Sequence, residues 1–192
     1  MKKIALSIAI IAAVFTGCTI DDETEVVKVP VTGEITGDLT VSKTYAYGNY
    51  TLKGFAKVAS GVTITFEAGS TITADKADGE DAFVILNGGK LIAVGTATEP
   101  IVFTEKSKVA GSWGGIIMYG NAPIVNSATN AAPQTATSED GLALPYGGSD
   151  AAHNGGTLKY VRVEYAGQVI TQNNKEQNGF SFYSVGSGTT LE

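Results

Sequence analysis

One charged pair in the chain has the spacing that acid–base chemistry needs. Arg162, the only arginine, and Glu164 lie two residues apart in an alternating run at 160–165. Residues at i and i+2 of a strand point to the same side, so we expect both side chains on one surface. Such a pair could act as acid and base in a polysaccharide lyase or hydrolase. On an open surface it would be an ion pair worth less than about 1 kcal/mol.

A second group of residues that could form a functional site consists of acids. Four carboxylates lie close together in the chain: Asp75, Asp78, Glu80 and Asp81. Carboxylate oxygens in a short loop are ligands that Ca²⁺ prefers. An EF-hand does not fit, because aligning Gly79 with the sixth loop position places Lys76 and Ile85 where ligands belong. The segment therefore predicts either a solvated turn or an irregular Ca²⁺ site, and no other cofactor.

Other catalytic arrangements are missing from the sequence. His153 is the only histidine, and no motif in the sequence pairs it with a serine or cysteine nucleophile in a triad. No cluster of histidine, cysteine and acidic residues has the spacing of a zinc site. The glycine pairs at 114–115 and 147–148 lack the Lys-Ser/Thr of a phosphate-binding loop. These absences argue against zinc and nucleotide chemistry.

Two tyrosines flank an unusually long connecting segment. Residues 121–155 are rich in small polar residues and contain three prolines, and Tyr119 and Tyr146 lie beside or within them. A loop this long within one domain usually binds something or has no fixed structure. Aromatic rings present flat apolar surfaces that can pack against sugar rings. We therefore predict that Tyr119 and Tyr146 contact a ligand, with a glycan as the candidate.

The elements that must position these residues are strands. Short runs of β-branched and aromatic residues recur between glycines, of which the chain has 24. Alternating examples occupy 62–66, 90–94, 101–104 and 160–165. A glycine, a spacer and a strand start repeat at irregular intervals, which indicates a right-handed parallel β-helix with strands about 4.8 Å apart. A β-sandwich is the alternative if the strands pair as hairpins.

The N-terminal segment predicts export and lipid anchoring. Residues 1–17 contain two lysines, an apolar run too short to span a membrane, and a small-residue cleavage site. Cys18, the only cysteine, follows Thr-Gly and resembles the lipobox cysteine of bacterial lipoproteins. Two or three acyl chains, palmitate among them, at roughly 0.8 kcal/mol per buried methylene would hold the protein on a membrane.

An acidic stretch follows the lipidation site. Residues 18–37 are polar and contain Asp21, Asp22, Glu23 and Glu25, so we expect a flexible tether with the folded domain at 38–192. The acidic run also resembles a signal that sends lipoproteins to the outer face of the outer membrane. The whole chain has 19 acidic and 13 basic residues, a balance that argues against nucleic-acid binding.

Several motifs in a fixed order resemble one known family. They are GGKLIAVGTATEPIVFT at 88–104, GSWGGII at 111–117, GTLKYVRVEYAG at 156–167, NG at 178–179 and VGSGTT at 185–190. Together they resemble the pectin-lyase-like, right-handed β-helix lipoproteins of the Gram-negative outer membrane. The resemblance covers roughly 50–192 and implies a β-helix and a surface lipoprotein, without an established activity. The family pattern continues beyond Glu192, so we expect a truncated member with an uncapped, incomplete last coil.

These observations leave three functions open. The first is a non-enzymatic surface lipoprotein for adhesion, glycan contact or envelope architecture. Its partners would be the membrane, through the lipid on Cys18, and a glycan or an envelope protein. The second is a polysaccharide lyase or hydrolase, which would use an arginine base and acids that hold Ca²⁺, as the resemblance implies. The third is a fragment without function.

Overall fold

The structure is a computed structural model that describes residues 27–124, 135–170 and 175–192. Strands are the main regular structure of the described chain, and the one helix in these ranges is the three-residue 3-10 turn η1 (Lys76–Asp78). No described helix is long and apolar enough to cross a membrane. The prediction of an all-β protein is confirmed.

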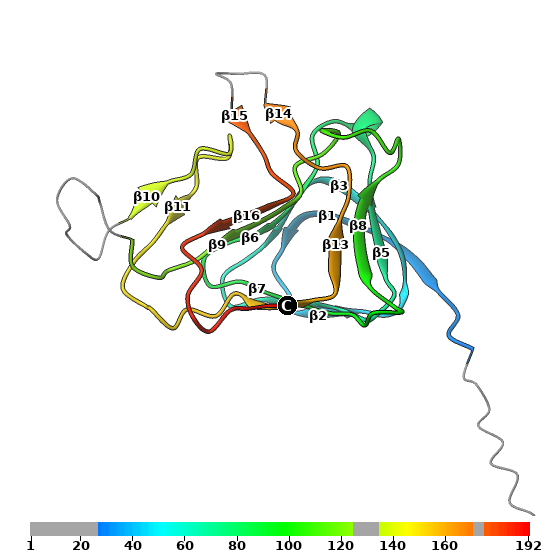
Figure 1. Ribbon diagram of the computed structural model, residues 1–192, viewed down its shortest axis with the longest axis horizontal. Coiled ribbons are helices and arrows are strands. Elements are labelled where there is room, and N and C mark those ends of the chain that lie inside the picture. The colour runs from blue at the N-terminus through cyan, green and yellow to red at the C-terminus, as the bar shows by residue number, and fades with distance from the viewer. Residues whose placement is uncertain (1–26, 125–134, 171–174) are drawn as a thin grey trace, which may run out of the picture.

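The strands wind into coils around three faces (Figure 1). The first face contains one half of β3 (Gly48–Val58) with β5 (Thr71–Ala74), β8 (Ile101–Glu105) and β13 (Val161–Val163). The second contains the other half of β3 with β6 (Ala82–Ile85), β9 (Ile116–Tyr119) and β16 (Phe180–Tyr183). The third contains β2 (Lys43–Tyr45), β4 (Thr63–Phe66), β7 (Lys90–Val94), β12 (Gly156–Lys159) and β17 (Thr190–Leu191).

Each turn of the chain visits the third, first and second face in that order. The turn formed by β4, β5 and β6 is followed by the turn formed by β7, β8 and β9. Strands on one face pair in parallel, so Ile72 lies between Tyr50 and Phe103 in a continuous column. Antiparallel pairing occurs, among the described strands, only in two short pairs: β10 (Ala136–Thr137) with β11 (Pro145–Tyr146), and β14 (Val169–Ile170) with β15 (Lys175–Glu176). This confirms the parallel β-helix, since a β-sandwich would need hairpins between its main strands.

The columns of inward side chains form the core. Phe66, Phe83 and Phe103 come from the three different faces and meet in the interior with ring centroids 5.6 to 5.8 Å apart. All three are buried, and their pairs are edge-on or tilted, an arrangement that aromatic quadrupoles favour. The strict alternation of buried and half-buried residues in β4 and β5 follows from this packing.

The folded domain begins earlier than the sequence indicated. We expected a tether as far as residue 37, whereas the strand β1 (Val31–Leu39) lies along β3 in parallel register. Ile35 is its one buried residue. Leu39 is half-buried against the core and the other side chains of β1 face solvent, and therefore its sequence lacks the apolar alternation by which strands are recognised.

Two strands bend where the first face meets the second. Gly54 divides β3 into its two halves, and Gly37 occupies the register shift in β1 beside it. Both have φ of +64°, a conformation that costs other residues strain. The bends allow one strand to contribute to two faces without an intervening loop.

The long connection between β9 and β12 covers the outer surface of the second face. It includes the hairpin of β10 (Ala136–Thr137) and β11 (Pro145–Tyr146), while 125–134 lie outside the described residues. Apolar residues on both sides form a small second core: Ala82, Val84, Ile117 and Tyr119 with Leu142, Leu144, Tyr146 and others. The strands β6 and β9 are therefore buried on both sides.

His153 is buried where this connection rejoins the coils. It is 6% exposed, and its Nε2 has no hydrogen-bond partner among the described residues. A Cβ on Gly186 would lie 2.5 Å from the His153 backbone nitrogen, so the last turn of the chain packs closely against it. Burial lowers the pKa of His153; Asp150 opposes this shift and Lys90 adds to it.

We expect acid to destabilise the protein through His153. Because its pKa is lowered in the folded protein, the His153 imidazole takes up a proton at about pH 6.5 only in the unfolded chain. In the folded chain the imidazole stays neutral at that pH. The free energy of unfolding, measured with urea between about pH 7.5 and 5, should therefore fall below pH 6.5 by at most about 1.4 kcal/mol per pH unit. His153→Gln should remove this slope. An equal slope in both proteins would contradict the assignment.

Candidate functional site

Arg162 and Glu164 form an ion pair at the edge of the first face. The Arg162 Nε atom lies 3.2 Å from Glu164 Oε1, and the side chains are 62% and 33% exposed. The other carboxylate oxygen of Glu164 accepts a hydrogen bond from Thr104 Oγ1 at 3.0 Å. The pair is thus formed by two residues of one coil and is tied to the coil before it.

The surroundings of this pair are hydroxylic and aliphatic. Arg162 lies in register with Val102 one coil earlier, and Val102 lies in register with Thr71 one coil before that. Beside Glu164, Thr104 continues the column to Thr73 and Thr51. Acid–base cleavage of a polysaccharide would need further carboxylates at these neighbouring positions, and the register places none there. The first face can instead offer a row of hydroxyl groups for hydrogen bonding.

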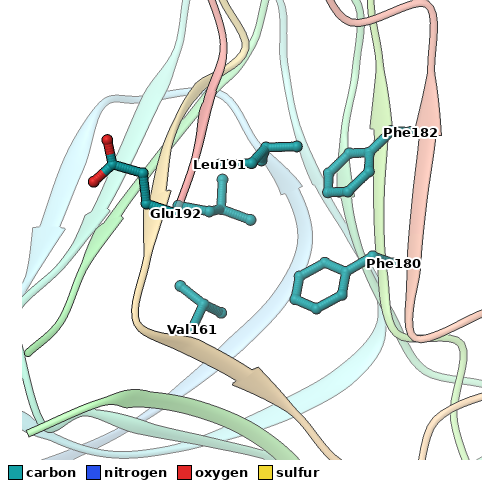
Figure 2. Close-up of a pocket in the computed structure, with 6 residues that line it drawn as sticks. Val161, Phe180, Phe182, Leu191 and Glu192 are labelled. Carbon is teal, nitrogen blue, oxygen red and sulfur yellow. The ribbon is translucent and has the colours of Figure 1, made fainter. Parts of the chain in front are cut away.

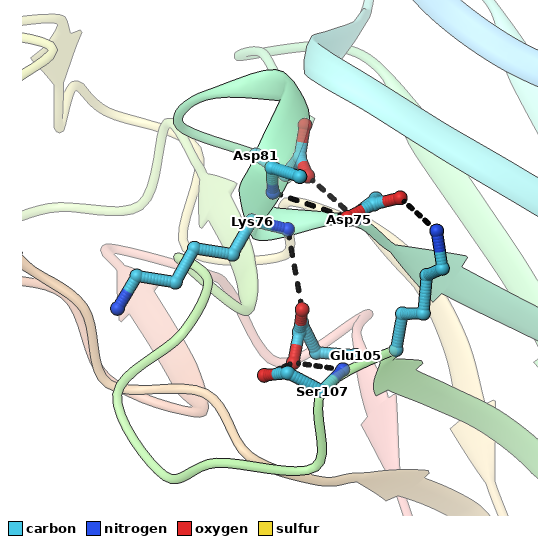
Figure 3. Close-up of polar contacts among 7 residues, drawn as sticks. Asp75, Lys76, Asp81, Glu105 and Ser107 are labelled. Carbon is cyan, nitrogen blue, oxygen red and sulfur yellow. Dashed lines mark hydrogen bonds and ion pairs between the residues drawn. The ribbon is translucent and has the colours of Figure 1, made fainter.

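Two buried carboxylates fasten the corner between the first and second faces (Figure 3). Asp81 is 1% exposed and accepts hydrogen bonds from the backbone of Gly54 at 2.5 Å and of Asp75 at 3.0 Å. Glu105 is also 1% exposed and accepts bonds from Lys76 N at 3.2 Å and from Ser107 N at 2.8 Å. Each acid therefore binds its own coil to the preceding one.

Asp75 belongs to the same corner but has different partners. Its carboxylate lies 2.7 Å from Lys106 Nζ and accepts a bond from Ala77 N at 3.1 Å, capping η1. The hydrogen bond from Lys106 is the main cause of its lowered pKa. Burial alone would raise the pKa of Glu105, yet the bonds from Ser107 and Lys76 outweigh it and lower that pKa.

The described members of the predicted Ca²⁺ site have other partners. Asp75 and Asp81 are bound by different groups, Glu80 is exposed, and the side chain of Asp78 lies outside the described structure. In the described ranges, no group of three or more histidine, cysteine or acidic side chains could hold a metal ion. The carboxylates that are described fit the role of backbone capping better than that of a cation site.

Tyr119 lines a hollow beneath the long connection. The hollow has a volume of about 290 Å³ and a mostly apolar wall made by Ser60, Leu86, Asn87, Tyr119, Leu144 and Pro145. Tyr119 itself is 1% exposed, and its hydroxyl donates to Asp140 and lies 3.2 Å from Ser138 Oγ. Because the Tyr119 hydroxyl is engaged by Asp140 and Ser138, a ligand in the hollow could contact only the edge of the Tyr119 ring.

Tyr146 lies next to this hollow in an aromatic cluster. Its ring centroid is 5.0 Å from that of Tyr183, which stacks on Tyr119 at 5.2 Å. Burial, reinforced by the nearby Asp140, raises the pKa of Tyr183 to about 12, so the Tyr183 hydroxyl stays protonated at neutral pH. The two predicted tyrosines are thus brought together through a third.

Sequence reasoning did not find Tyr183, Asp140 or Ser138. Asp140 is buried and accepts bonds from Ser138 Oγ at 2.8 Å and from Leu142 N at 3.0 Å, which shapes the β10–β11 hairpin. The dipeptide Asp140-Gly141 was the available signal, because such pairs are typical of hairpin turns. Nothing in the sequence indicated that this hairpin folds over Tyr119.

Asp81→Ala should destabilise the protein because it removes the carboxylate that accepts hydrogen bonds from the backbone N–H groups of Gly54 and Asp75. We expect the free energy of unfolding to fall by about 1–3 kcal/mol for each buried N–H left without a partner. Glu80→Ala, one residue away and exposed, is the matched control and should change it by less than about 0.5 kcal/mol. Urea denaturation measures both, and equal losses would refute the structural role of Asp81.

Comparison with known proteins agrees with this architecture. Residues 33–192 match the family model described as a pectate-lyase like beta helix domain. Comparison with curated proteins gives no match, and comparison with solved structures gives none either. The matched range begins in β1 and includes all the later coils. The chain therefore belongs to the pectate-lyase-like β-helix family.

Proposed function

We propose that this protein is a surface-exposed lipoprotein of the outer membrane whose β-helix binds a glycan or an envelope component without catalysis. The family supports a surface protein of this fold. The strongest support for a non-catalytic role is the setting of Arg162 and Glu164, which pair with each other among threonine and valine side chains.

The alternative, a lyase or hydrolase of the pectin-lyase-like type, lacks such support. A base must stand within hydrogen-bond reach of the proton that it removes, and an acid must face the leaving group. Two acids at the corner between the first two faces, Asp81 and Glu105, already accept hydrogen bonds from backbone N–H groups. A binding role requires none of these groups to react.

The hollow beneath the long connection is the proposed contact for a sugar. Its wall combines the ring of Tyr119 and the apolar Leu86, Leu144 and Pro145 with the Asn87 amide. Binding sites for small molecules commonly join a mostly apolar wall to a few polar groups. The wall contains no charged side chain, which favours a neutral sugar over an acidic one.

A glycan array probed with the full chain tests this proposal. We expect binding to neutral oligosaccharides that Asn87→Ala weakens at least about tenfold, since it removes the one amide side chain of the described wall. Asn49→Ala, an exposed residue of the first face, is the matched control and should bind as the wild type does.

Two outcomes of that work would count against the proposal. Binding that Asn49→Ala abolishes and Asn87→Ala leaves intact would move the contact to the first face. Release of unsaturated uronic acid ends from pectate, lost in Arg162→Ala, would establish the lyase alternative instead.

The anchor can be tested separately, because Cys18 lies outside the described residues. We expect the full chain to incorporate labelled palmitate in bacteria and to fractionate with the outer membrane. Cys18→Ala should lose the label, because no other cysteine can take the lipid. Protease added to intact cells should degrade the wild-type domain, and complete protection would contradict surface exposure.

A further inference from the structure

The hollow beneath the long connection contains one residue whose charge is open to chemical change. Asn87 lines it together with Tyr119 and the apolar Leu144. The Asn87 side chain is exposed, and its amide makes no hydrogen bond with a described residue. Gly88 follows it, and glycine has no side chain to hinder the ring closure by which an asparagine loses ammonia. Asn87 is therefore a candidate for deamidation inside a candidate binding site.

Asn87 and Gly88 form the tip of the turn that joins β6 to β7. Gly89 N donates to the Leu86 carbonyl oxygen at 2.8 Å, which closes the turn around them. Gly61 N donates to the Gly88 carbonyl oxygen at 2.9 Å and ties the turn to the preceding coil. No described residue accepts a hydrogen bond from the Gly88 N–H. The nitrogen that closes the ring is therefore not held by a bond that must first break.

The turn also requires the glycine that makes this asparagine reactive. Gly88 has a φ of +85°, a conformation that strains residues with a side chain. A Cβ at this position would lie 2.4 Å from Ser60 Oγ, so Ser60 would have to move. A larger residue would slow the ring closure, but it would also strain the turn. The geometry of the turn therefore maintains the reactivity of Asn87.

A second Asn-Gly pair, Asn154 and Gly155, is held by hydrogen bonds at both reacting groups. Asn154 Oδ1 accepts a bond from Gly156 N at 2.8 Å, and Gly155 N donates to Thr189 Oγ1 at 2.9 Å. Ring closure at Asn154 would break both bonds. From the usual net strength of two such bonds, we expect Asn154 to react at least about fivefold more slowly than Asn87.

The third Asn-Gly pair and the other hollow lack this combination. Asn178 is exposed but is not among the described residues that line either hollow. The other hollow, also of about 290 Å³, lies beside the rings of Phe180 and Phe182, and the Glu192 carboxylate points away from it (Figure 2). Its described wall contains no asparagine. Of the described lining residues of both hollows, Asn87 is the one that this reaction can charge.

We propose that Asn87 is a modification site whose deamidation makes the hollow beneath the long connection acidic. The Gly88 nitrogen bonds to Asn87 Cγ, the Cγ–Nδ2 bond breaks, and ammonia leaves with the proton from the Gly88 nitrogen. Water then opens the succinimide at either carbonyl group and leaves aspartate or isoaspartate. The described wall has no other charged side chain, so this carboxylate sets the charge of the hollow. The effect on sugar binding rests on the proposed function, whereas the modification does not.

Peptide mass spectrometry of the full chain, incubated in a mild detergent at mildly alkaline pH, tests the modification. In the folded protein Asn87 should convert to aspartate and isoaspartate at least about fivefold faster than Asn154. In the urea-unfolded chain both should convert at similar rates, because both precede glycine and the bonds that hold Asn154 are lost. Equal rates in the folded protein, or faster conversion of Asn154, would overturn the modification site.

The effect on binding is measured on the same samples. Fully converted protein should bind neutral oligosaccharides at least about tenfold more weakly than fresh protein, and fresh Asn87→Asp should be similarly weak. Asn87→Gln, whose longer side chain closes a ring slowly, should bind equally before and after incubation. An affinity that conversion of Asn87 leaves unchanged would overturn the effect on binding. Fresh wild type that binds no neutral sugar would refute the proposed function, while the mass data still decide the modification.

Discussion

Parallel pairing between successive coils is the interaction on which the rest of this structure depends. It fixes the register so that each inward residue lies over an inward residue of the coil before, as Tyr50, Ile72 and Phe103 do. A shift by one residue would turn every core side chain outward, so the apolar columns and the hydrogen-bonded ladders enforce each other. The connections at the corners can therefore differ in length from coil to coil, while the strands of each face keep the same parallel pairing.

The corners show how that freedom is controlled. Between the first and second faces the coils connect through a single bend at Gly54, then through η1, and then through longer segments. Such irregular backbone exposes N–H groups that no strand can pair. Asp81 and Glu105 accept bonds from these groups, which explains why Asp81, one of the predicted Ca²⁺ ligands, is buried. Trp113 has a similar function further along, where its buried indole donates to the Glu164 carbonyl oxygen at 2.7 Å.

The sequence predicted the elements that repeat and missed those that occur once. Alternation in 62–66 and 101–104 placed strands correctly, because each half-buried strand repeats the same pattern. β1 was not predicted because only Ile35 is fully buried in the core, with Leu39 packed partly against it.

The site was harder to predict than the strands. The spacing of Arg162 and Glu164 indicated a shared surface, but not the threonine column beside it, which depends on contacts between coils distant in sequence. Likewise, the position of Tyr119 over Tyr183 depends on how a long connection folds back, and no local pattern encodes that.

The distribution of burial determines where this β-helix can meet a partner from its sides. Because the long connection covers the second face, Tyr119 and Ile117 are withdrawn from solvent on the outside as well as the inside. The third face presents another column of mostly threonine, running through Thr44, Thr65, Ile92, Thr157 and Thr190. Hydroxyl columns on two faces suit broad, weak hydrogen bonding, whereas the hollow under the connection is concave and mostly apolar. Our proposed selective contact lies where, among the described segments, the connection between β9 and β12 adds a wall to the regular coils through Leu144 and Pro145.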